Sequence, residues 1–294
     1  MRPAAPPVLP AVAEPPAAAA VMSKAAHENF PVASRVLPRR QRAHLMALYG
    51  FARLVDDVGD EAPGDRLALL DWLDAEVDRI YGGQPGEPEN PLLRRLADTV
   101  RACDIPPAPL RALIAANRQD QEVHSYETVE DLLAYCELSA NPVGRLVLHV
   151  FDAATPDRLS LSDSVCGGLQ LVEHWQDVAE DLGRGRVYIP AEDLDRFGCT
   201  PDDLAAPVAA EPVRRLMAFE VARARRLLDE GAPLVRTLTG RPALAVAAFV
   251  AGGRAALDAI ARAGYDVLAH SPRPARIQRA TALARTIAGS HRGP

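Results

Sequence analysis

Apolar residues recur along this chain at spacings of three and four positions, which is the period of an α-helix. Clusters of Pro or Gly, such as Pro63-Gly64 and Pro106-Pro107, separate the periodic segments and are typical of helix ends. Only the run 187–189 has the composition of a strand. The pattern predicts helices over 41–58, 66–81, 92–102, 109–123, 129–151, 160–182, 211–238, 242–268 and 275–288. We therefore expect an all-α fold.

The chain divides into a short tail and one large domain. Residues 1–21 hold six prolines and a run of alanines, which bury too little apolar surface to offset the entropy lost on ordering. We expect these residues to form a disordered tail. No Pro-, Gly- or Ser-rich linker divides the rest, so the sequence predicts one all-α domain over 22–294.

Composition narrows the class of protein. Hydrophobic residues make up 48% of the chain and charged residues 24%, as in globular proteins, and the net charge of −6 argues against a nucleic-acid partner. Cys103, Cys136, Cys166 and Cys199 lie far apart, so we expect free thiols in a reducing compartment. Since no run reaches the ~18 consecutive apolar residues of a membrane span, we expect a cytoplasmic protein whose membrane contact is peripheral.

Two segments each place aspartates four residues apart. Asp56 and Asp60 lie in RLVDDVGDE, and Asp177 and Asp181 lie in QDVAED. On a helix, each pair shares one face, with its carboxylates about 6 Å apart along the axis. Taken singly, either pair is more simply a solvated helix face. Both pairs follow apolar helical segments, however, and two facing pairs suit Mg²⁺, which takes one or two carboxylates and completes its shell with water and phosphate.

Other catalytic schemes have no support in the sequence. The chain contains no G-x-S-x-G, H-E-x-x-H, Walker lysine loop or G-x-G-x-x-G. Its seven histidines show no ligand spacing with the cysteines, so we do not expect zinc. Metal-assisted departure of a diphosphate remains the chemistry that the residues favour.

Three blocks then carry a resemblance. LYGFARLVDDVGDE, YCELSANPVGRL and LQLVEHWQDVAEDLGRGRVYIP occur in this order, and from about His27 onward the chain resembles the squalene/phytoene synthase family. HENFPVASRVLP and SANPVG are most similar to its hydroxysqualene synthase branch, from bacterial hopanoid biosynthesis. The resemblance implies a single large helical bundle of the isoprenoid synthase type with a central cavity.

The resemblance also implies the metal ligands. In this family the aspartates matching Asp56, Asp60, Asp177 and Asp181 hold Mg²⁺. Glu173 stands where the family usually has Asn, and His174 follows it where an aromatic residue is usual. Glu173 can still ligate Mg²⁺, but it adds a negative charge beside a diphosphate and should weaken substrate binding.

Further roles are carried over from the family. Tyr49 and Arg53 match diphosphate-contacting positions, and we expect Arg53 to act in catalysis as well. Tyr135 matches a tyrosine implicated in the carbocation steps, although the sequence alone allows a core tyrosine. Asp120 and Gln121 match a polar pair at the cavity mouth, and we expect both to act in catalysis by holding the water that attacks. The remaining substrate-binding positions are Ala140, Val143 and Gly144 along the prenyl cavity, Gln170 and Tyr188 at the second metal site, and Tyr265 near the diphosphate.

The resemblance implies a reaction. Presqualene diphosphate would lose its diphosphate to Mg²⁺, and water would capture the rearranged cation to give hydroxysqualene, with no nicotinamide required. Alternatives within the family are presqualene diphosphate, squalene or phytoene synthase, acting on farnesyl or geranylgeranyl diphosphate. An alternative of another class is a non-catalytic helical scaffold with solvated acidic pairs. We expect a monomer or a weak dimer.

Overall fold

The structure, a computed structural model, describes residues 15–24, 37–82 and 86–291. Within these ranges the chain is helical, and strand pairing is limited to one isolated bridge between Ser125 and Val187. The all-α prediction is confirmed. The elements in chain order are α1 (Ala18–Ser23), α3 (Arg39–Asp60), α4 (Arg66–Ile80), α5 (Pro91–Cys103), α6 (Pro107–Gln119), α7 (Val129–Ser139), α8 (Asn141–Val150), α9 (Pro156–Gln176), α10 (Val178–Gly183), α11 (Ala191–Phe197), the 3₁₀ turn η2 (Pro201–Ala205), α12 (Glu211–Gly231), α13 (Leu234–Thr237), α14 (Gly240–Arg262) and α15 (Arg276–His291).

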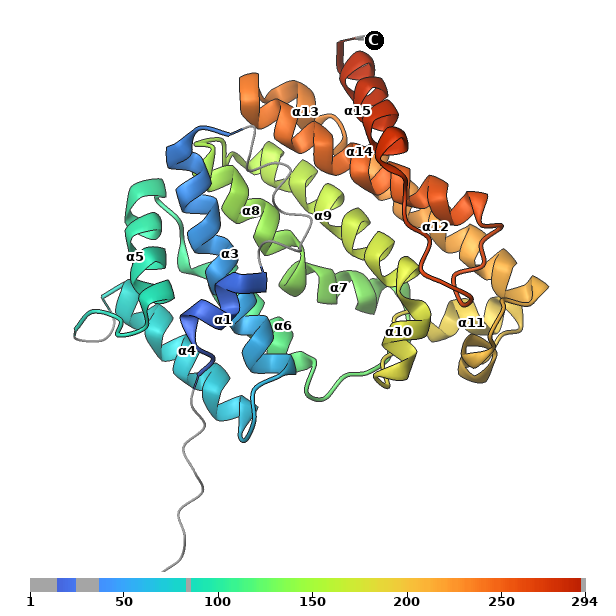
Figure 1. Ribbon diagram of the computed structural model, residues 1–294, viewed down its shortest axis with the longest axis horizontal. Helices are drawn as coiled ribbons and strands as arrows, with labels where there is room; N and C mark the ends of the chain where they lie inside the picture. The colour runs from blue at the N-terminus through green and yellow to red at the C-terminus, as the bar shows by residue number, and fades with distance from the viewer. Residues whose placement is uncertain (1–14, 25–36, 83–85, 292–294) are drawn as a thin grey trace, which may run out of the picture.

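Helices α8 and α9 run through the middle of the molecule. Helices α3 to α6 lie on one side of them, and α12, α14 and α15 lie on the other (Figure 1). The buried apolar side chains form two clusters, one around α3, α4, α5 and α6 and the other around α9 and α12. The long central helices therefore connect two halves of one core.

Three predicted helices are broken where the backbone cannot continue them. The segment 129–151 splits at Ala140, because Pro142 lacks the N–H that an uninterrupted helix needs. The segment 160–182 splits at Asp177, which ends α9, and the segment 211–238 ends its long helix at Gly231, before Pro233. The hydrophobic period continues across each break, so the sequence pattern alone does not show it.

Part of the segment that we assigned to a tail is helical. Residues 18–21, which we assigned to it, belong to α1, and Val21 is fully buried against the first core cluster. Residues 1–14 lie outside the described residues, as does most of the HENFPVAS block, residues 27–34.

Helix α14 is long and apolar enough to cross a membrane by length and composition, with a mean hydropathy of 1.6 over its best stretch. No other helix in the described ranges passes that test. Of that stretch, 61% is buried inside the protein, where α14 packs against α9, α12 and α15. A core helix of a globular domain shows the same features.

Small residues let the central helices approach one another closely. At the end of α12, a Cβ on Gly231 would lie 2.7 Å from the backbone oxygen of Leu161 and 2.7 Å from the backbone nitrogen of Val165, both in α9. In α14, Gly252 faces open space instead. The contact between α9 and α12 therefore requires a glycine at position 231.

We predict that Gly231→Ala lowers the free energy of unfolding by roughly 1–3 kcal/mol, because backbone atoms of α9 cannot move aside for the methyl group. Gly252→Ala is the control, and it should raise the free energy of unfolding by roughly 0.5–1 kcal/mol, since alanine favours a helix. Chemical denaturation measures both. A Gly231→Ala variant as stable as the wild type would contradict the packing described for α9 and α12.

Candidate active site

The first aspartate pair lies on the last two turns of α3. Asp56 and Asp60 are both exposed, whereas Asp57 between them is buried. Asp57 is paired with Lys24, whose Nζ lies 2.9 Å from its Oδ1, and with Arg53, whose Nε lies 2.7 Å from the same atom. The helical period thus turns Asp57 into the protein, where its carboxylate is structural, and leaves Asp56 and Asp60 facing outward.

Asp56 is exposed to water along one side, but its carboxyl group lies close to the protein at the end of α3. This partial burial raises its pKa to about 6, and the neighbouring charges of Asp60 and Asp57 add to the effect. Asn117 of α6 donates from Nδ2 to Oδ1 of Asp56 at 3.3 Å. Gly59 makes this approach possible, because a Cβ there would collide with the Asn117 side chain.

The second pair spans a break between helices. We expected Asp177 and Asp181 on one helix, but Asp177 ends α9 and Asp181 belongs to α10. The backbone N–H of Asp181 still donates to the carbonyl of Asp177 at 2.8 Å, so the helical spacing survives. Asp177 accepts hydrogen bonds from Ser271 Oγ at 2.8 Å and from Arg273 at 3.0 Å. Burial and the charge of Asp177 raise the pKa of Asp181 to about 6.

Arg186 connects the two pairs. Its guanidinium donates to Oδ1 of Asp60 at 2.9 Å, and its positive charge also acts on the pKa values of Asp181 and Asp120. The segment that carries Arg186 is anchored next to it, where Val187 N–H donates to the carbonyl of His124 at 2.8 Å. Arg186 thus links Asp60 of the first pair to Asp181 of the second, and no prediction from the sequence had assigned it a role. We call the four aspartates of the two pairs the aspartate site.

Aromatic rings are grouped next to the aspartate site. Tyr126, Tyr135, His174 and Tyr188 form an aromatic cluster, in which Tyr135 lies 5.6 Å from Tyr126 and 6.1 Å from Tyr188 between ring centroids. The Tyr135 hydroxyl donates to Oδ2 of Asp120 at 3.0 Å, and burial raises the pKa of both groups. Burial also lowers the pKa of His174 to about 3, so its ring is neutral.

Several predicted residues make structural contacts here. Arg53 pairs with Asp57 and lies 3.3 Å from Oε1 of Glu61, and Tyr49 is buried one turn earlier on α3. Gln121 donates to the backbone carbonyls of Gly59 and Asn117, both at 3.0 Å, and so joins the end of α6 to α3. The Gln121 side chain, which we expected at the cavity mouth, is thus hydrogen-bonded to two backbone carbonyls.

The remaining predicted residues lie near the helix breaks at Ala140 and Asp177. Ala140 is buried at the junction of α7 and α8, and Val143 is 37% exposed. Gly144 faces α9, where a Cβ would collide with Cys166 and Ser162, so it serves close packing. Among the second-site residues, Gln170 lies 3.1 Å from His174, and Glu173 is exposed on α9 one turn before Asp177.

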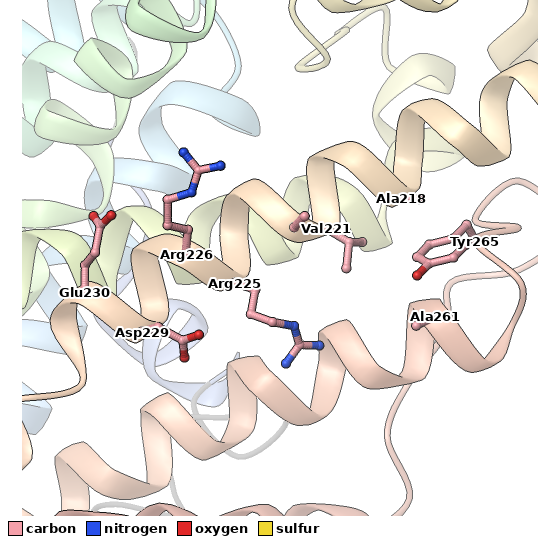
Figure 2. Close-up of a pocket in the computed structure, with 9 residues that line it drawn as sticks. Ala218, Val221, Arg225, Arg226, Asp229, Glu230, Ala261 and Tyr265 are labelled. Carbon is pink, nitrogen blue, oxygen red and sulfur yellow. The ribbon is translucent and has the colours of Figure 1, made fainter.

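Tyr265 lies away from where we expected it. It follows α14 with a positive φ of 60°, and its side chain lines a groove between α12 and α14. Figure 2 shows its ring beside Val221 and Ala261, in the groove that also holds Arg225. The left-handed turn at Gly264 and Tyr265 aims the ring toward α12, and the loop that follows brings Ser271 and Arg273 to Asp177 instead.

The carboxylates of the aspartate site are hard oxygen donors of the kind that Mg²⁺ prefers. In the described part of the chain, no three His, Cys, Asp or Glu side chains are grouped closely enough to form a complete metal cage. Each pair can offer two carboxylates at most. This donor set fits a cation whose shell is completed by water and phosphate.

Sequence comparison decides the family. A model of squalene/phytoene synthases matches residues 23–281, which is most of the chain. The chain belongs to the squalene/phytoene synthase family. Curated relatives include hydroxysqualene synthases from Sinorhizobium fredii, 37% identical over 71% of this chain and 70% of that protein, and from Rhodopseudomonas palustris, 34% identical over 70% of each. The resemblance seen in the sequence blocks is confirmed.

Solved structures agree with this family. A squalene synthase, HpnC, from Alicyclobacillus acidocaldarius is 45% identical, with a TM-score of 0.79 over 83% of this chain and 92% of that one. A ligand-bound dehydrosqualene synthase, 24% identical, shares the fold with a TM-score of 0.81. The helical bundle of the isoprenoid synthases is confirmed, and the chain is an enzyme of this type rather than a non-catalytic scaffold.

The neighbours Asp56 and Asp57 should respond in opposite ways to removal of their charge. Because the folded pKa of Asp56 is raised from 3.8 to about 6, the native state binds this proton more tightly than the unfolded state. Wild-type stability therefore falls as the pH rises from about 4 to 6. We predict that metal-free Asp56→Asn melts at a higher temperature than the wild type at pH 7, with the difference vanishing near pH 4.

Asp57→Asn is the matched control. It removes a buried anion from Lys24 and Arg53, and we expect the free energy of unfolding to fall by roughly 1.5–3 kcal/mol. Thermal melts in a chelator over pH 4–8 measure both variants. An Asp56→Asn variant that is less stable than the wild type at pH 7 would show that the Asp56 carboxylate has stabilising partners.

Proposed function

We propose that this enzyme is a hydroxysqualene synthase, which converts presqualene diphosphate and water to hydroxysqualene and diphosphate with Mg²⁺. The observation that carries the proposal is the pairing of Asp60 with Arg186, next to Asp181, because it gathers both aspartate pairs at one site. The hydroxysqualene synthases among its relatives support the choice of reaction.

Mg²⁺ would be held by Asp56 and Asp60 on one side and by Asp177 and Asp181 on the other, with Glu173 as a further ligand. When bound, the cation neutralises the charge that develops on the diphosphate leaving group. Because the pKa values of Asp56 and Asp181 are raised to about 6, protons would compete with metal for both carboxylates below about pH 6.

The chain's own residues divide the remaining work. Arg186 and Arg273 lie at the aspartate site. When the aspartates bind metal, the two planar guanidinium groups would be able to donate to phosphate oxygens instead. Asp120, hydrogen-bonded to Tyr135, would orient the water that captures the cation and accept its proton. Val143, with its exposed apolar side chain, would contact the prenyl chain.

We place this reaction in hopanoid biosynthesis, in the cytoplasm, with peripheral contact to the membrane in which a C30 substrate dissolves. A second candidate is squalene synthase, because a solved structure that is 45% identical carries that name. The two reactions start from the same intermediate and differ in what ends the cation: water in one, hydride from a nicotinamide in the other.

The aspartates should be essential for turnover and not for folding. We predict that Asp56→Asn and Asp177→Asn each reduce kcat by at least roughly a hundredfold, because each loses a metal-ligand charge while keeping its shape. Asp258→Asn, which alters a surface ion pair with Arg225, is the control and should retain activity. Diphosphate release under saturating Mg²⁺ measures all three, and a fully active Asp56→Asn, Asp177→Asn double variant would end the metal hypothesis.

The product identifies the branch. We predict that presqualene diphosphate with Mg²⁺ yields a C30 alcohol, with or without reduced nicotinamide. In water enriched in oxygen-18, the alcohol should carry the label, because solvent supplies its hydroxyl group. Mass spectrometry of the extracted product measures both.

Two other outcomes would reassign the enzyme within its family. Squalene that forms only when NADPH is present would make it a squalene synthase. Conversion of farnesyl diphosphate to presqualene diphosphate, with no further reaction, would make it a first-step enzyme. Geranylgeranyl diphosphate is the third substrate to test, since phytoene synthases are also among the relatives.

A further inference from the structure

We infer that His174 is a positioning residue that couples the two aspartate pairs. One face of its ring supports the segment that carries Arg186 to Asp60, and one ring nitrogen faces Asp181. The inference rests on the proposed function, because the coupling matters only if both pairs hold one metal–diphosphate group.

The stacking contact of His174 is the tightest in the aromatic cluster. Its ring centroid lies 3.7 Å from that of Tyr188, with the planes 17° apart. The other contacts of Tyr188 are longer, at 6.0 Å to Tyr126 and 6.1 Å to Tyr135. His174 itself is 6% exposed and lies on the rigid α9. Tyr188 therefore rests on the histidine ring rather than on the tyrosines.

Tyr188 in turn fixes the direction of Arg186. The two residues are separated only by Val187, whose N–H is bonded to the carbonyl of His124 at 2.8 Å. With one residue pinned by that bond and the next by the stack, the preceding arginine is directed toward Asp60, 2.9 Å away. The stack thus acts on the first aspartate pair from a helix that carries the second.

One ring nitrogen of His174 lies near the second pair, and the other is held by Gln170. Nε2 lies 3.1 Å from Nε2 of Gln170, and since an amide nitrogen can only donate, this ring nitrogen accepts. The ring proton is then on Nδ1, which lies 4.0 Å from Oδ2 of Asp181. At 4.0 Å this contact is longer than a hydrogen bond, so the polar N–H acts on the Asp181 carboxylate through space.

A phenyl ring could supply the stack but not the nitrogens. His174→Phe and His174→Ala therefore separate the two roles: phenylalanine keeps a ring on Tyr188, whereas alanine removes both the ring and the nitrogens.

The first measurement is hydrogen exchange of the peptide covering residues 184–190 in the metal-free protein. We expect exchange at least tenfold faster in His174→Ala and close to wild-type rates in His174→Phe. The second is binding of Mn²⁺, as a probe for Mg²⁺, in the presence of inorganic diphosphate, followed by electron paramagnetic resonance. We expect roughly tenfold weaker binding in both variants.

His44→Phe is the matched control, since His44 contacts Thr99 at 3.1 Å between α3 and α5 and should change neither measurement. Wild-type exchange in His174→Ala, or wild-type Mn²⁺ affinity in His174→Phe, would overturn the coupling. If His174→Ala unfolds, the phenylalanine variant still decides the role of the nitrogens. Absence of Mn²⁺–diphosphate binding by the wild type would contradict the proposed function instead, and the exchange measurement would still test the stack.

Discussion

The aspartate site places like charges together at the ends of helices, partly enclosed by protein. A carboxylate enclosed by protein holds its proton more tightly, and a second carboxylate nearby strengthens the effect, which is why the pKa values of Asp56 and Asp181 rise to about 6. Such an arrangement is unfavourable for a folded protein without a cation. The surrounding structure holds the carboxylates in place and supplies basic groups that reduce the electrostatic repulsion between them.

Two kinds of basic partner meet this constraint. Lys24 and Arg53 neutralise Asp57, which faces the core and has no place in the site. Arg186 and Arg273 instead reach Asp60 and Asp177 from loops, so one aspartate of each pair carries a basic partner. The first kind of partner stabilises the fold, and the second reduces the repulsion between the carboxylates of the site.

The helical core makes this arrangement rigid. Gly231 allows α12 to contact the backbone of α9, the helix that ends at Asp177, and Gly59 admits Asn117 against the first pair. The helix break at Asp177 also helps to form the site. Because α9 stops at Asp177, the chain can turn through α10 and return the segment of Arg186 and Tyr188 to the loop before α7.

The sequence by itself determined the helices and the aspartates. A period of 3.6 residues depends only on neighbours along the chain, so it predicted most helices and placed Asp56 and Asp60 on one face. The same logic failed at Asp177, where the apolar period runs on but the backbone does not. The three sequence blocks identified the family, because they carry specific residues in a fixed order.

Only the tertiary structure decided which residues complete the site. Arg186 and Asp60 are 126 positions apart, and Arg273 and Asp177 are 96 apart, so no local pattern links them. A left-handed turn directs Tyr265 into the groove between α12 and α14, and two backbone carbonyls hold Gln121 against the end of α3, next to Asp60. Local propensity fixes where a helix runs, but contacts between distant loops depend on how the helices pack, and that packing is the sum of interactions over the whole chain.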